Sequence, residues 1–212
     1  MVEIPEILVA EFERRLIAAS SLPLAPGVTR ALHAHYQELR RWSPTLALIG
    51  PGVVGELFER HYAESLAAQP LLPEGPLKLL DVGSGAGFPG LILAALRPDL
   101  EVTLTEARQR KWAFLVAACR RARLSCRCLN VRVSPSTAAQ LPEDISVVTA
   151  RAVRVDLPAW EALIPRLLPG ARALFWSGDE VLAPPPPFRE GRTVRLPGDR
   201  RWIREYCWLG NR

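Results

Sequence analysis

Residues Leu77–Gly90, with the sequence LKLLDVGSGAGFPG, decide how the rest of the chain is interpreted. The apolar stretch Leu77–Val82 predicts a buried strand that carries an acid, Asp81, near its carboxyl end. Glycines then alternate with small residues, and Pro89 stands in the first turn of a helix predicted by the apolar run Leu91–Leu96. Strand, glycine-rich loop and helix are the first unit of a doubly wound α/β sheet. Such a sheet binds its ligand at the carboxyl edge of the strands.

The glycine loop is compatible with two classes of ligand. Its spacing, Gly85-x-Gly87-x-x-Gly90, matches the dinucleotide fingerprint, which is a weak signal by itself. A pyrophosphate is disfavoured, because Asp81 places a negative charge at the loop and Pro89 removes a backbone N–H from the helix start. S-adenosylmethionine carries a sulfonium and an ammonium group, and its adenosine packs well against bare glycine backbone. We therefore expect S-adenosylmethionine here, with a nicotinamide dinucleotide as the alternative.

A second acid supports this interpretation. Glu106 ends the predicted strand Val102–Thr105, where a carboxylate is placed to accept hydrogen bonds from both ribose hydroxyls. An acidic cap on the following helix is the alternative role for Glu106.

Composition limits the classes of protein to consider. The chain has 212 residues, 49% hydrophobic, with a net charge of +5, which suits one α/β domain with a small addition and mildly favours a polyanionic partner. Only Lys78 and Lys111 are lysines, so the positive charge is almost all arginine; phosphate binding and a biased composition explain this equally well. The N-terminus is too acidic for a signal peptide, and no apolar run approaches the ~20 residues of a membrane helix. We expect a cytoplasmic protein with reduced cysteines.

The chain divides into two predicted parts. Residues 1–70 predict an N-terminal helical cap, and residues 71–212 an α/β domain. The cap contains three predicted helices, at Ile4–Ala19, Val28–Trp42 and Val53–Gln69.

After Glu106, helical and extended patterns alternate. Helices are predicted at Ala107–Ala122, with Trp112, Leu115 and Val116 inward, and at Pro158–Leu168. Strands are predicted at Cys126–Val131, Ile145–Ala150, Ala171–Trp176, Thr193–Leu196 and Trp202–Trp208, with an extended connector at Pro184–Pro187. The last two strands join without a helix, so an antiparallel ending is expected. This predicts the Rossmann-like, seven-stranded architecture of class I S-adenosylmethionine-dependent methyltransferases.

The stretch from Tyr36 to Ala152, and weakly the C-terminal strands, resembles the GidB (RsmG) family, which methylates guanine N7 in small-subunit (16S) rRNA. The resemblance rests on the following motifs: Asp81 through Gly90 with its Phe-Pro-Gly close, Arg97-Pro98, Glu106, Arg110-Lys111-x-x-Phe114-Leu115, Arg60-His61-x-x-Glu64-Ser65 and Val148 through Ala152.

The resemblance also implies site residues. The family's cofactor positions fall on Gly83, Phe88, Val133, Ser134 and Arg151. They join the candidates from the glycine loop and the second acid, namely Asp81, Ser84, Gly85, Gly87 and Glu106. Phe88 would pack near the cofactor, and Val133 and Ser134 would line the adenine. Arg151 is also the candidate for positioning the substrate, with an ion pair to Glu64 or Asp156 as its alternative role. RNA contacts fall on Arg60, His61, Arg108, Arg110 and Lys111.

The chemistry implied needs no general base, because guanine N7 carries a free lone pair and no proton. His33 and His35 are accordingly expected on the surface, and His61 is expected to be structural. No metal site is expected. The partner would be small-subunit rRNA or the 30S subunit, bound by a monomer.

Three positions depart from the family pattern: Ala47-Leu48-Ile49 replaces Asn-Leu-Thr, Ser177 replaces a lysine, and Ser134 replaces an acid. A methyltransferase-fold RNA-binding or assembly protein therefore remains an alternative function, and an NAD-dependent oxidoreductase is a second one.

Overall fold

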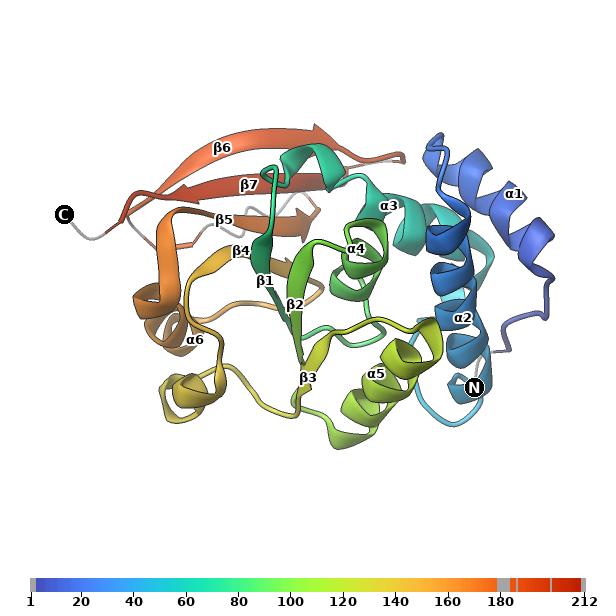
Figure 1. Ribbon diagram of the computed structural model, residues 1–212, viewed down its shortest axis with the longest axis horizontal. Helices are drawn as coiled ribbons and strands as arrows, with labels where there is room; N and C mark the ends of the chain where they lie inside the picture. The colour runs from blue at the N-terminus through green and yellow to red at the C-terminus, as the bar shows by residue number, and fades with distance from the viewer. Residues whose placement is uncertain (1–2, 179–183, 186, 199, 211–212) are drawn as a thin grey trace.

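The computed structural model describes residues 3–178, 184–185, 187–198 and 200–210. Within these ranges, seven strands form one sheet in the order β3-β2-β1-β4-β5-β7-β6 (Figure 1). The strands are β1 (Leu77–Val82), β2 (Leu100–Thr105), β3 (Arg127–Leu129), β4 (Ile145–Arg151), β5 (Leu167–Ser177), β6 (Phe188–Arg195) and β7 (Trp202–Trp208). β1 to β5 are parallel, whereas β7 runs antiparallel to both β5 and β6. The predicted architecture and its antiparallel ending are confirmed.

Helices cover both faces of the sheet. On one face, Leu79 of β1 packs with α4 (Gly90–Leu96), α5 (Gln109–Ala122) and the N-terminal helices. On the other, Leu80 packs with α6 (Leu157–Leu163), and Figure 1 shows α4 and α6 on opposite sides of the sheet. The short helices η4 (Pro135–Gln140) and η5 (Ile164–Arg166) flank α6 in sequence. Burial on both faces explains why the parallel strands have nearly continuous apolar sequences.

The N-terminal part is helical, but its helices differ from the prediction. α1 spans Val9–Ser20 and begins later than expected, with Leu8 79% exposed just before it. α2 spans Pro26–Trp42, and Pro26 opens this helix rather than separating it from α1. The proline ring suits a first helical turn, where the N–H has no partner. The division of the chain at residue 70 stays a prediction.

The segment predicted as one helix over Val53–Gln69 is instead a series of short helical pieces. They are the 3₁₀ helix η1 (Pro51–Glu56), the π-helix η2 (Phe58–Ala63), the single α-turn α3 (Glu64–Leu66) and the 3₁₀ helix η3 (Gln69–Leu71). Single π-turns are often found at functional sites. Here the backbone carbonyl of Arg60, within the π-turn, accepts a hydrogen bond from the Arg151 side chain, so a contact distant in sequence uses this turn.

Three other features differ from the prediction. In α5, Val116 is 41% exposed, and Phe114, Leu115 and Ala118 form the buried face instead. β3 is shorter than its prediction. The helix expected at Pro158–Leu168 ends earlier, because Leu167 already pairs with Ile145 and the ladder shifts register before it continues. The connector Pro184–Pro187 lies partly outside the described residues.

A close approach between α4 and the sheet fixes the position of the glycine loop. A Cβ on Gly90 would lie 2.7 Å from the Asp81 carboxylate and 2.6 Å from Leu104 Cδ2. Only glycine leaves room for α4 to start directly against β1 and β2, as in dinucleotide-binding folds.

Candidate functional site

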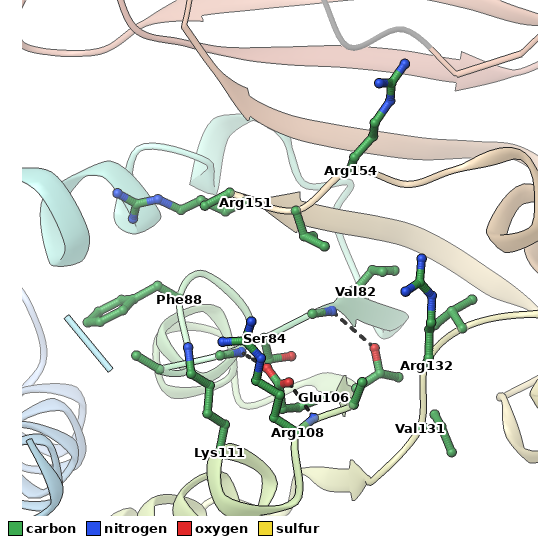
Figure 2. Close-up of a pocket in the computed structure, with 18 of the residues that line it drawn as sticks. Val82, Ser84, Phe88, Glu106, Arg108, Lys111, Val131, Arg132, Arg151 and Arg154 are labelled. Atoms are coloured by element: carbon green, nitrogen blue, oxygen red, sulfur yellow. Dashed lines mark hydrogen bonds between the residues drawn. The ribbon is translucent and has the colours of Figure 1, made fainter. Parts of the chain in front are cut away.

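A cavity of ≈ 450 Å³ opens beside the glycine loop, where β1, β2 and β4 end (Figure 2). This volume lies within the range of about 300–1,000 Å³ that is usual for small-molecule sites. The cavity is lined by ten of the residues that the sequence analysis predicted for the site: His61, Gly83, Ser84, Gly85, Phe88, Glu106, Arg108, Lys111, Val133 and Arg151. Five others do not: Arg60, Asp81, Gly87, Arg110 and Ser134.

The glycine loop presents bare backbone to this cavity. The N–H of Gly83 donates to Thr105 Oγ1 at 3.3 Å, and the N–H of Ser84 donates to the Thr105 carbonyl at 2.8 Å. These bonds tie the loop to the end of β2. Gly85 has φ +55°, in the left-handed region that a β-branched residue avoids.

Glu106 is held with its carboxylate against the loop. Its Oε2 accepts the N–H of Gly85 at 3.1 Å, and its Oε1 accepts the N–H of Arg108 at 2.8 Å (Figure 2). The residue is 8% exposed and lines the cavity. Each carboxylate oxygen has a second lone pair, so two neighbouring hydroxyls have acceptors here. Asn130 fixes the same turn by donating to the Glu106 carbonyl at 2.9 Å.

Asp81 lies beneath the loop rather than in the cavity wall. It is 1% exposed, and its carboxylate accepts hydrogen bonds from the Thr149 hydroxyl at 2.6 Å and the Gly90 N–H at 3.3 Å. Burial raises the pKa of Asp81 to about 6, although these two bonds favour the charged form. The structure therefore shows Asp81 bracing the loop and α4, with no direct exposure to a ligand in the cavity.

One part of the cavity wall is apolar. Val131 and Val133 form this wall together with Ala159, and Val133 is 4% exposed. Ser134 instead caps η4, where its backbone N–H donates to Thr137 Oγ1 at 3.1 Å in a capping box. A flat aromatic ring would fit between such aliphatic side chains.

Phe88 and His61 line the opposite end, and His35 lies buried behind Phe88. The imidazole of His61 stacks on the Phe88 ring, with centroids 5.0 Å apart and planes 26° apart. His35 was expected on the surface, but it is fully buried: Nδ1 lies 2.8 Å from the Tyr62 hydroxyl and Nε2 2.8 Å from the Ala86 carbonyl. That expectation was wrong because α2 packs directly on the glycine loop.

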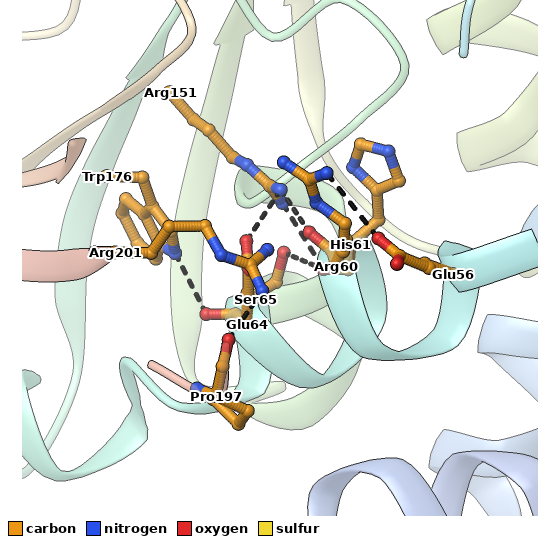
Figure 3. A network of polar contacts seen from close by, with 9 residues as sticks. All are labelled: Glu56, Arg60, His61, Glu64, Ser65, Arg151, Trp176, Pro197 and Arg201. Carbon is orange, nitrogen blue, oxygen red and sulfur yellow. Dashed lines mark hydrogen bonds and ion pairs between the residues drawn. The ribbon is translucent and has the colours of Figure 1, made fainter. Parts of the chain in front are cut away.

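The guanidinium of Arg151 points toward Arg60 and Glu64 in the N-terminal helical part (Figure 3). It pairs with Glu64 at 2.8 Å and also donates to the carbonyls of Arg60 and His61. Arg201 pairs with the same carboxylate, and Trp176 Nε1 donates to the Glu64 carbonyl at 2.8 Å. Burial lowers the pKa of Arg151 to about 10. Of the two roles considered, the geometry matches the ion pair with Glu64.

Cations still surround the mouth of the cavity. Arg108 and Lys111 lie on one side, and Arg132 and Arg154, which the sequence reasoning missed, lie on the other (Figure 2). Arg132 pairs with Asp156 at 2.9 Å. The sequence did contain a signal for these two arginines. Arg132 follows β3 and Arg154 follows β4, and parallel strands end at one edge of a sheet, where the ligand binds.

The remaining predicted cations lie farther out. Arg110 donates to the Thr45 carbonyl at 2.9 Å, beside a smaller pocket of ≈ 300 Å³ that it lines with Arg108 and Lys111. Arg60 faces Glu56 at 3.5 Å (Figure 3). Ile49, which departs from the family pattern, lines the main cavity together with Leu48, so both place aliphatic side chains in its wall.

Over the described ranges, no group of three or more His, Cys, Asp or Glu side chains is arranged to hold a metal ion. The four cysteines, Cys119, Cys126, Cys128 and Cys207, are free thiols. No described helix is long and apolar enough to cross a membrane.

Strand order, glycine loop and the acid after β2 together define the class I S-adenosylmethionine-dependent methyltransferase fold. The cavity suits that cofactor, because Glu106 offers acceptors for a ribose beside bare glycine backbone and an apolar wall for a base. The chain belongs to the GidB family, described as rRNA small subunit methyltransferase G, whose model matches residues 28–182.

Curated relatives agree with this assignment. The chain is 37% identical over 165 residues to ribosomal RNA small subunit methyltransferase G of Rhodospirillum rubrum, covering 77% of this chain and 79% of that protein. It is 43% identical over 132 residues to the protein of the same name in Desulfotalea psychrophila, covering 60% of this chain but only 59% of that protein's length.

Solved structures support the fold. A putative methyltransferase, yhhF, from Escherichia coli superposes with a TM-score of 0.54 at 20% identity, covering 70% of this chain and 84% of that chain. A SAM-dependent methyltransferase from Aquifex aeolicus superposes with a TM-score of 0.53 at 16% identity, covering 68% of this chain and 88% of that chain.

Proposed function

We propose that this protein transfers the methyl group of S-adenosylmethionine to N7 of a guanosine in 16S rRNA. The observation that carries the proposal is the Glu106 carboxylate, held by the N–H groups of Gly85 and Arg108 at the cavity wall of a GidB-family chain. When bound, the cofactor supplies an electrophilic methyl group on a sulfonium. N7 of guanine attacks with a lone pair that bears no proton, so the residues act by holding and orienting the two partners.

The cofactor's parts have distinct supports in this proposal. Glu106 accepts the ribose hydroxyls, and Val133 packs on the adenine. The backbone of Gly83, Ser84 and Gly85 faces the methionine part, as the lining of the cavity suggests. Asp81 and Gly87 act on the loop from behind: Asp81 through its bonds to Gly90 and Thr149, and Gly87 by packing next to His35.

The rRNA contacts in this proposal follow the cations around the mouth. Arg108 and Lys111 contact phosphates on one side, and Arg132 and Arg154 on the other, because arginine and lysine neutralise the RNA backbone. Arg110 and Arg60 extend the same basic surface outward. We propose that the enzyme acts as a monomer in the cytoplasm, on rRNA or on the assembling 30S subunit.

A transfer assay tests the function. Tritiated S-adenosylmethionine is incubated with deproteinised small-subunit rRNA and with intact subunits from a strain that lacks the enzyme. The product is mapped by borohydride–aniline cleavage, which is specific for 7-methylguanosine. We expect label at a guanosine N7 with the wild type and strong loss of transfer with Glu106→Ala.

The matched control is Glu101→Ala, which removes an exposed carboxylate from the same strand, β2, and should retain activity. Cofactor binding without transfer to any rRNA or subunit would favour the RNA-binding or assembly function. Binding of NAD without binding of S-adenosylmethionine would favour the oxidoreductase.

A further inference from the structure

His61 is a half-buried residue of the cavity wall, and neither of its ring nitrogens has a hydrogen-bonding partner among the described residues. Both ring nitrogens are shielded from solvent, and no acceptor or donor among the described residues reaches either of them. His35, on α2, instead uses both nitrogens in hydrogen bonds of 2.8 Å. Leaving a buried polar group unpaired costs about 1–3 kcal/mol. An unpaired polar group of this kind in a cavity wall needs an explanation, and hydrogen bonding to a bound ligand would explain it.

The surroundings of His61 keep its ring neutral. Three cations on three elements act on it: Arg60 on η2, Arg151 on β4 and Arg201 before β7, the last two paired with Glu64. Burial, reinforced by these charges, lowers the pKa of His61 to about 3. A neutral imidazole offers one N–H donor and one acceptor nitrogen. Phe88 holds the ring plane by stacking on it at 5.0 Å.

The location of His61 shows which partner it would meet. Figure 2 shows Phe88 and Val131 on opposite sides of Glu106, so the Phe88–His61 end lies beyond the ribose acceptor and away from the apolar wall of Val131 and Val133. In the proposed function this is the end where the methyl group and the target base meet. Arg151 is not available for the base there, because its guanidinium is paired with Glu64.

We infer that, when the target guanine enters this end of the cavity, the His61 ring shifts to present its N–H to O6, donates to it and so aims N7 at the methyl group. O6 and N7 are neighbouring acceptors on one edge of guanine. A neutral donor at O6 orients this edge and leaves the N7 lone pair free to attack. This inference rests on the proposed function, since it names the group that recognises the base in the same cavity.

Two variants separate the hydrogen bond from packing. His61→Phe retains a flat ring on Phe88 and removes the N–H. His61→Asn retains a side-chain N–H donor. His33→Asn is the matched control, since it changes an imidazole on α2 that does not line the cavity. The measurements are the dissociation constant of S-adenosylmethionine by calorimetry, kcat/KM for rRNA, and the melting temperature.

We expect His61→Phe to lower kcat/KM by about 10- to 100-fold, the usual effect of removing one hydrogen bond to a buried partner. Cofactor affinity should stay within about twofold, and His61→Asn should recover part of the loss. His33→Asn should resemble the wild type.

A substrate analogue tests the contact to O6 directly. A ligated rRNA carries 2-aminopurine, which has N7 but lacks O6, at the guanosine that the wild type methylates. The wild type should lose about as much activity on this RNA as His61→Phe loses on normal RNA, and His61→Phe should lose nothing further. Equal losses in both proteins would overturn the inference, as would a cofactor affinity lowered more than about tenfold. Wild-type protein that methylates no guanosine N7 would instead overturn the proposed function, and this inference with it.

Discussion

Replacing Asp81 with asparagine is expected to make the folded protein more stable at neutral pH while weakening its hold on S-adenosylmethionine. The carboxylate is 1% exposed and accepts bonds from the Thr149 hydroxyl and the Gly90 N–H. An asparagine of the same shape accepts from Gly90 through its oxygen and donates to Thr149 through its NH₂. The substitution therefore removes a buried charge and retains the packing.

The magnitude follows from the pKa of Asp81. Burial raises this pKa from 3.8 to about 6, which corresponds to about 3 kcal/mol in the free energy of unfolding. Because the folded-state pKa lies above the unfolded one, the contribution is fully present below pH ~3.8 and is lost as the pH rises through about 6. Asparagine does not ionise. Its advantage over aspartate should grow across this interval and level off at up to about 3 kcal/mol, or about 6–12 °C in Tm.

Urea unfolding at several pH values between about 4.5 and 7.5 measures this difference. Asp99→Asn is the matched control: a surface pair with Arg97 holds the pKa of Asp99 below its usual value, so this substitution should bring no gain at neutral pH. Stability curves for Asp81→Asn and the wild type that run parallel over the whole range would refute the buried-charge argument. Calorimetry should show weaker cofactor binding, because a negative charge behind the loop attracts the cofactor's cationic groups.

Four further substitutions test the site. Glu106→Ala should weaken S-adenosylmethionine binding more than tenfold in calorimetry, since charge-assisted hydrogen bonds are worth about 1.5–3 kcal/mol; unchanged affinity would remove Glu106 from the site. Gly85→Val should abolish cofactor binding, because φ +55° excludes a β-branched residue; tight binding by this variant would mean that the loop does not face the cofactor. Arg154→Ala should make the salt dependence of RNA binding, measured by filter binding, shallower by about one phosphate contact. Arg151→Ala should leave that salt dependence unchanged and lower Tm. A shallower salt dependence for Arg151→Ala and an unchanged one for Arg154→Ala would contradict these roles.

Much of the fold was readable from local pattern, and the errors have a common origin. The strand Leu77–Val82 is predicted correctly because a parallel strand buried on both faces is apolar along its length. The predicted boundaries of helices and strands were wrong where a residue distant in sequence pairs with the segment. For example, β5 begins at Leu167 because Ile145 pairs with it. The helix expected at Val53–Gln69 likewise broke into short pieces beside Arg151, a residue far away in sequence.

By itself, the sequence determined the features that depend on neighbours along the chain. The loop at Gly83–Gly90 and the acid at Glu106 are set by glycine conformation and by the end of a strand, so this end of the cavity was predictable. Only the tertiary structure decided where long side chains point. Arg151 turns to Glu64, 87 residues away, because a buried guanidinium needs a carboxylate and carbonyls. His61 has no hydrogen-bonding partner among the described residues, because the fold surrounds its ring with cations and an aromatic side chain, and spacing along a chain encodes the position of neither.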